Sequence, residues 1–166
     1  MTSSSRIASL AVVAIAFMGC GDTRLKVSGS VNLTLMQIGQ PDGSTGFTFP
    51  ADTIVESNPT GFCRINGGRA EVLLERAGGT ADGLRSVRVV IPPSSATGSD
   101  PATVSFVVGT STFDGGNTCT RTSAISGSGE LRELSVTMEC TGLRAQNDAR
   151  TASASIRLSL SNCTAQ

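Results

Sequence analysis

The segment LKVSGSVNLTL, residues 25–35, decides the fold class of this chain. Apolar residues occupy its odd positions, interrupted once by Gly29, and every even position from 26 to 34 is polar. A period of two residues is typical of a β-strand, because successive side chains of a strand point to opposite faces of the sheet. The segment therefore predicts a strand with one face on a core and the other in water.

The same alternation recurs near the other end of the chain, at TASASIRLSL (151–160) and LSVTMEC (134–140). Between these segments, clusters rich in glycine, proline, serine and aspartate separate shorter apolar runs, as turns separate strands. Short strands at this spacing predict one antiparallel β-sandwich of about 7–9 strands, with a barrel as the alternative. The weaker runs cover residues 46–49, 61–65, 69–76, 84–91, 103–108 and 117–125, and the turn clusters are PDGSTG, SNPTG, AGGTADG, PPSSATGSDP, FDGGN and SGSG.

One of the weaker runs allows a second interpretation. In RAEVLLERA (69–77) the apolar residues fit the spacing of a short helix as well as the alternation of a strand. Nine residues between glycines make a marginal helix, because isolated helices of this length are barely stable. We therefore expect a strand here.

The amino terminus has the composition of an export signal. MTSSSR places one basic residue, Arg6, ahead of IASLAVVAIAFMG (7–19), an uncharged run of 13 residues. This length lies within the range of about 7 to 15 for a signal-peptide core and below the roughly 17 to 25 that a membrane-spanning helix needs. Residues 1–19 are therefore predicted to be a signal peptide.

The apolar run ends at a cysteine, in the sequence FMGC (17–20). The glycine and cysteine at this place resemble the lipobox of bacterial lipoproteins, in which the cysteine is lipidated before the signal peptide is cut ahead of it. Cleavage by ordinary signal peptidase after Ala14-Ile15-Ala16 is the alternative, and it would leave five cysteines, one of them unpaired. Lipidation of Cys20 leaves an even number for disulfides, which favours the lipobox.

The resemblance to bacterial lipoproteins implies a protein held at a membrane of the cell envelope. Cys20 would carry several acyl chains, which together anchor a protein stably. Residues 20–24 would form a short lipidated tether, and residues 25–166 the β-sandwich domain. Gly21 takes the place where an aspartate would favour retention on the inner membrane, so the outer membrane is favoured. Without lipidation, the chain would be a soluble secreted β-domain.

Four further cysteines, Cys63, Cys119, Cys140 and Cys163, allow three disulfide connectivities. Their spacing does not resemble a zinc site, because no two lie within four residues of each other and the chain has no histidine, so no metal is expected. A hairpin turning at Ser128-Gly129, with a bulge of one or two residues, would bring Cys119 opposite Cys140. Cys63 would then pair with Cys163.

The composition excludes several classes of function. The chain contains no histidine, tryptophan or tyrosine. Catalytic triads that use histidine are therefore impossible, no Gly-x-Ser-x-Gly motif is present, and the aromatic platforms that usually bind sugars are missing. Without Arg6, 12 scattered basic residues face 13 acidic ones, which argues against a nucleic-acid partner. No cofactor or small-molecule substrate is expected.

Two kinds of acidic pattern remain as candidates for chemistry. The pairs Glu71 with Glu75 and Glu133 with Glu139 offer two carboxylates each, as a hydrolase without histidine would need, but solvated strand faces explain them better. The stretches PDG, ADG and FDGG (41–43, 81–83 and 113–116) place one acid beside glycine, which is typical of a turn and too few acids for a calcium loop.

The sequence thus predicts a lipid-anchored cell-envelope protein that is a non-catalytic structural or protein-binding module. An envelope protein would be its partner, because the edge strand of an antiparallel sandwich can pair with a strand of another protein without any special side chain. An unrecognised hydrolase that depends on carboxylates is the alternative.

Overall fold

The computed structural model describes residues 23–37, 40–78, 83–93, 102–115 and 119–166. These residues form ten strands and no helix, which confirms the all-β class, with one strand more than the upper end of the expected range. Residues 1–22, with the expected signal peptide and Cys20, lie outside the described residues. The strands are β1 (Lys26–Gln37), β2 (Gln40–Ile54), β3 (Thr60–Asn66), β4 (Arg69–Glu75), β5 (Leu84–Ile91), β6 (Thr103–Val108), β7 (Ser111–Gly115), β8 (Cys119–Ser126), β9 (Leu131–Ala145) and β10 (Thr151–Ala165).

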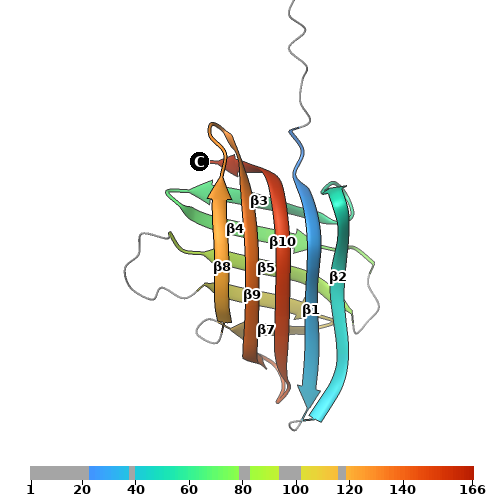
Figure 1. Ribbon diagram of the computed structural model, residues 1–166. Helices are drawn as coiled ribbons and strands as arrows, with labels where there is room; N and C mark the ends of the chain where they lie inside the picture. The colour runs from blue at the N-terminus through green and yellow to red at the C-terminus, as the bar shows by residue number, and fades with distance from the viewer. Residues whose placement is uncertain (1–22, 38–39, 79–82, 94–101, 116–118) are drawn as a thin grey trace, which may run out of the picture.

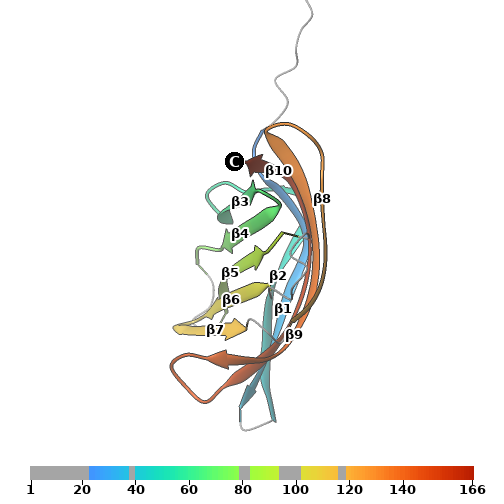
Figure 2. The same cartoon turned by 90° about the vertical axis from the view of Figure 1, so that its left-hand side faces the viewer.

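The ten strands form one hydrogen-bonded sheet that folds over into two layers. The front layer has the order β2-β1-β10-β9-β8, and the back layer has the order β3-β4-β5-β6-β7. The back strands run across the front strands, and the edge-on view shows the two layers facing each other (Figures 1 and 2). Apolar side chains fill the space between the layers, and the largest of them that are fully buried include Phe106, Phe113, Leu33, Leu74 and Met138.

Strand β1 has the alternation that the opening segment predicts. Val27, Val31, Leu33 and Leu35 are buried, while Asn32 and Thr34, which alternate with the last three of them, are exposed. The strand pairs with β10 without a register shift, and Gly29 lies opposite Leu158. A Cβ atom at Gly29 would lie 1.9 Å from the carbonyl oxygen of Arg157, so the two backbones approach more closely than any side chain permits.

The layers are joined at two corners, where the long strands β9 and β10 bend (Figure 2). At one corner, Thr164 and Ala165 of β10 pair in parallel with β3. At the other corner, Arg144 and Ala145 of β9 pair with β7. In sandwiches with crossing strands, such corners are made by strands that pass from one sheet to the other through bends or bulges.

Each bent strand carries a bulge just before its corner. In β9, Thr141 and Gly142 lie opposite one residue of β10, and in β10, Ser161 and Asn162 lie opposite one residue of β9. Each bulge contains a residue with left-handed backbone, Gly142 with φ of 67° and Asn162 with φ of 64°. Both bulges move the buried positions from even to odd numbers, which brings Leu143 and Cys163 into the core.

Three local predictions were wrong. PDGSTG (41–46) was expected to be a turn, but it lies within β2, because β2 follows β1 along almost its whole length. The first residues of FDGGN (113–115) belong to β7, where they pair with β6. The β8–β9 hairpin contains no bulge: its register is constant from Cys119 to Ser126, because the connection lies one residue further along than Ser128-Gly129. The segment Arg69–Glu75 is the strand β4, as expected.

Candidate functional site

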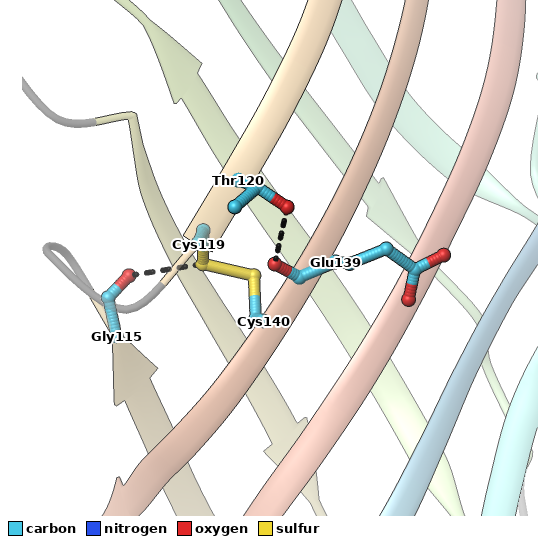
Figure 3. Close-up of a disulfide and its surroundings, with 5 residues drawn as sticks. All are labelled: Gly115, Cys119, Thr120, Glu139 and Cys140. Carbon is cyan, nitrogen blue, oxygen red and sulfur yellow. Dashed lines mark hydrogen bonds between the residues drawn. A yellow bond between two sulfur atoms is a disulfide. The ribbon is translucent and has the colours of Figure 1, made fainter.

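The four cysteines form two disulfides, and the pairs are those expected from the sequence. Cys63 of β3 is bonded to Cys163 of β10, across 100 residues of chain. Cys119 of β8 is bonded to Cys140 of β9, and the two residues lie directly opposite each other in the hairpin (Figure 3). One disulfide therefore fixes a corner between the layers, and the other fixes the register of the outermost front strand.

The candidate carboxylates lie on solvent-facing surfaces and have polar partners. Glu71 accepts hydrogen bonds from the Arg88 guanidinium at 2.5 and 3.0 Å. The second pair of candidates lies on β9, where Glu133 accepts from the Ser126 hydroxyl at 3.2 Å and Glu139 accepts from Ser155 at 2.8 Å. The carboxylate of Glu75 faces the hydroxyl of Thr60 at 3.5 Å. None of these contacts places two carboxylates together.

The aspartates of the acid–glycine stretches are dispersed. Asp42 lies in β2, and Asp114 lies near the end of β7, where its carboxylate accepts a hydrogen bond from the Gln146 amide. The remaining stretch, 81–83, has its aspartate outside the described residues, as does Cys20. Within the described part of the chain, no three acidic, cysteine or histidine residues gather as a metal site would require.

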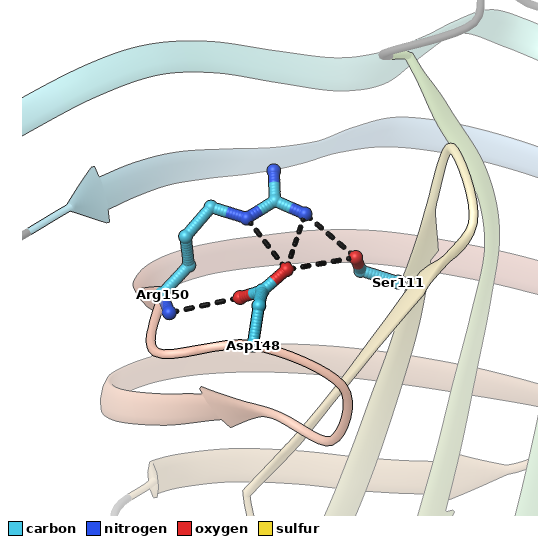
Figure 4. A network of polar contacts seen from close by, with 3 residues as sticks. All are labelled: Ser111, Asp148 and Arg150. Carbon is cyan, nitrogen blue, oxygen red and sulfur yellow. Dashed lines mark hydrogen bonds and ion pairs between the residues drawn. The ribbon is translucent and has the colours of Figure 1, made fainter.

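A polar cluster joins the β6–β7 turn to the β9–β10 turn (Figure 4). The Asp148 carboxylate accepts hydrogen bonds from the Arg150 guanidinium at 2.7 and 2.9 Å and from the Ser111 hydroxyl at 3.1 Å. The guanidinium and the backbone N–H of Arg150 lower the pKa of Asp148 to about 2, and the Ser111 hydroxyl contributes less. Since these groups satisfy one another, the cluster is a structural link between two turns.

Strand β8 forms one edge of the front layer, and no described strand pairs with its outer side. Its disulfide turns Cys119 toward the core, so the side chains two, four and six residues later, Arg121, Ser123 and Ile125, point to the same side. Their partners on β9 are the buried Met138, Val136 and Leu134. Half of the β8 side chains therefore extend the inner face of the front layer.

The same three residues present their backbone to the open edge. In an antiparallel pair, opposed residues alternate between a wide hydrogen-bonded pair and a narrow one that makes no bonds across the ladder. The Cα atoms of Cys119 and Cys140 are 4.0 Å apart, which identifies the narrow kind. The N–H and C=O groups of Arg121, Ser123 and Ile125 share this phase, so they point away from β9 toward solvent.

A cleft of about 440 Å³ opens between β8 and the ends of the back strands. The β3–β4 turn and the end of β5 extend beyond β8 in Figure 1, so part of the back layer lies next to the open edge of β8. The residues that line the cleft are Ile65, Gly67, Gly68, Ile91, Pro92, Arg121, Ser123, Ile125, Arg132, Ala165 and Gln166.

Arg121 is the residue of this cleft that sequence reasoning missed. Its Nη1 atom is buried and has no hydrogen-bond partner among the described residues. Arg121 as a whole is half-buried, but a buried nitrogen of a charged group usually has a hydrogen-bond partner, because an unpaired polar atom in a poorly hydrated place is unfavourable. The signal was present in CTRTSAI (119–125): if Cys119 faces the core, the alternation of a strand turns Arg121 to the same side.

Comparisons with protein-family models, with curated proteins and with solved structures find no match. In the described part of the chain, no helix has the length and apolar character needed to cross a membrane. The open edge of β8 and the cleft beside it are therefore assigned from geometry alone.

Proposed function

We propose that this chain is a lipid-anchored envelope protein that binds an extended segment of a partner protein along the open edge of β8. The anchor is inferred from the signal peptide and from the lipobox-like FMGC (17–20). The outer membrane is its location, because Gly21 follows the cysteine. The binding role is supported by the free edge and by the cleft next to it.

The observation that carries the proposal is that backbone N–H and C=O groups of β8 point away from β9, toward solvent. Three successive odd residues, Arg121, Ser123 and Ile125, offer N–H and C=O groups in the spacing of a strand ladder. An added strand gains affinity from such main-chain hydrogen bonds, while pockets for its alternate side chains give specificity. This mode of recognition leaves no catalytic motif in the sequence, in agreement with the absence of histidine.

The two edge strands of the front layer, β2 and β8, are not equally able to pair with a strand of a partner. Strand β2 contains two prolines, at positions 41 and 50, and its pairing with β1 shifts register twice. Its Thr45 hydroxyl also accepts a hydrogen bond from the backbone N–H of Leu84 at 2.8 Å. Proline and bulges are features by which proteins protect sheet edges from pairing. Strand β8 has neither proline nor a bulge, so it is the edge that accepts a partner.

The anchor is tested by replacing Cys20 with serine in cells labelled with radioactive palmitate. The lipid acceptor is then missing, so the label should be lost and the uncut precursor should accumulate. Normal processing of the Cys20→Ser variant to a soluble form would show that the chain is secreted without an anchor.

The open edge is tested by amide hydrogen exchange, measured by NMR on the mature protein. The amides of Ser123 and Ile125 point to solvent in the proposed arrangement and should exchange fast. Those of Thr122 and Ala124 point to β9 and should be protected. Uniform protection along β8 would mean that the edge is already paired, and the proposal would be wrong.

A further inference from the structure

The cleft beside β8 has a chemical character of its own. Its lining includes two arginines, Arg121 and Arg132, and no acidic side chain among the described residues. Ile65, Ile91 and Ile125 supply apolar walls. The site is therefore suited to a group that has a negative charge at the end of a short aliphatic stem.

Arg121 lies in this cleft with one nitrogen of its guanidinium, Nη1, buried and without a hydrogen-bond partner among the described residues. The disulfide between Cys119 and Cys140 fixes its strand, and the opposite residue on β9 is the fully buried Met138, whose thioether sulfur is only a weak hydrogen-bond acceptor. The Nη1 donor is thus available to a carboxylate, the group whose geometry fits a guanidinium.

An arginine that faces inward also limits which strands can pair with β8. A charge on the inner face of an edge strand disfavours pairing with an apolar strand, because the charge would be covered without compensation. A strand that carries a carboxylate at the matching position removes this penalty. Arg121 therefore disfavours pairing of β8 with apolar strands and favours pairing with strands that carry an acidic residue at the matching position.

On the basis of the function proposed above, we infer that β8 selects partner segments with an aspartate or glutamate opposite Arg121. In an added strand, the residue directly opposite another one shares its face of the sheet, so its carboxylate would enter the cleft beside the guanidinium. The apolar walls would pack against its methylene groups. The ligand is thus an acidic side chain within an extended peptide, and not a peptide carboxyl terminus.

The inference is tested by selecting peptides from a displayed library of nine-residue sequences with alternating apolar and random positions. The bait is the mature protein as its host processes it, purified in mild detergent. Peptides that bind the wild type should be enriched in aspartate or glutamate at one inward position. Selected peptides are then synthesised with amidated carboxyl termini, and a loss of binding on amidation would show that a terminal carboxylate is the ligand and overturn the inference.

The Arg121→Met variant tests whether Arg121 is the residue that binds the acidic side chain of the peptide. Its affinity for a glutamate-containing peptide should fall by about 10- to 100-fold, as expected for a hydrogen bond to a charged group. Its affinity for the same peptide with glutamine should change by less than threefold. The matched control is Arg157→Met, which removes the same charge from an exposed side chain on β10 and should not change either affinity.

The possible outcomes separate this inference from the proposed function. If no peptide binds the wild type, the proposed function itself fails. If peptides bind without an acidic preference, or if Arg121→Met keeps that preference, strand binding stands and the role of Arg121 is wrong. The urea midpoint of Arg121→Met, without peptide, should equal or exceed that of the wild type. A clear decrease would show that Arg121 already has a partner in the free protein, which would also overturn the inference.

Discussion

The two disulfides are expected to contribute unequally to stability, and the difference follows from the lengths of chain they close. The perturbation is replacement of both cysteines of one pair by alanine, giving either Cys63→Ala with Cys163→Ala or Cys119→Ala with Cys140→Ala. Each double variant removes two sulfur atoms, and at least one cysteine of each pair is fully buried. Cys63 and Cys163 are both buried, whereas Cys119 is only partly buried, so any difference in lost packing acts in the same direction as the difference in loop length.

The magnitude comes from the entropy that each bond removes from the unfolded chain. The chain-entropy model gives about 4.7 kcal/mol for a separation of 100 residues and about 3.3 kcal/mol for one of 21. The difference of about 1.4 kcal/mol corresponds to about tenfold in the unfolding equilibrium. A domain of this size is stable by about 5 to 15 kcal/mol, so either loss is large and neither necessarily prevents folding.

The assay is urea unfolding, followed by far-ultraviolet circular dichroism, of protein made in an oxidising compartment. With a slope of about 1 to 3 kcal/mol per molar, the variant without Cys63 and Cys163 should unfold about 0.5 to 1.4 M earlier than the other variant. The reasoning would be refuted if the variant without Cys119 and Cys140 unfolded at the same concentration or earlier. Register in the β8–β9 hairpin would then matter more than loop length.

Three further changes test the geometry. Gly29→Ala should cost more than about 2 kcal/mol in unfolding free energy, because the added Cβ meets a backbone oxygen and φ is 116°, whereas Gly43→Ala, with nothing within 4 Å, should cost less than about 0.5 kcal/mol. Asn162→Val should destabilise clearly more than Asn162→Gly in the same urea assay, because a β-branched residue tolerates positive φ poorly and glycine tolerates it well. Because the pKa of Asp148 lies below its value in the unfolded chain, the contribution of Asp148 to folding stability is complete above about pH 4 and is lost as the pH falls toward about 2. In the Asp148→Asn variant, stability should therefore depend less on pH between these values. An unchanged pH dependence would contradict the role of Arg150.

The sequence predicted those parts of the fold in which one face of a strand is buried along its whole length. In residues 25–35, apart from Gly29, and in residues 151–160, polar and apolar residues alternate, and a one-residue slip would place every apolar side chain in water. Strand β2 was mostly missed because its first half is rich in glycine and serine, which are typical of turns. It is a strand because β1 offers a complete row of backbone partners.

The candidate site was predicted only in part, since its components come from distant segments. The pairing of Cys119 with Cys140 could be inferred, because a hairpin relates residues by simple arithmetic. The cleft could not, because it also needs the β3–β4 turn and the end of β5, whose position relative to β8 depends on how the layers cross. Arg121 lies between two polar residues in the sequence, so its half-buried place on the inner side of β8 is evident only once the phase of β8 is known.

The bulge at Asn162 links the corner of the sandwich to the candidate site. It turns the end of β10 toward β3, where the backbone N–H of Gln166 donates to the Ile65 carbonyl at 2.9 Å and Cys163 reaches Cys63. Ile65 and Gln166 both line the cleft, so its wall is held by the same disulfide that closes the longest loop. Loss of that disulfide should therefore loosen the cleft as well as the fold. Loss of the bond between Cys119 and Cys140 should instead release β8, the strand that would carry the partner.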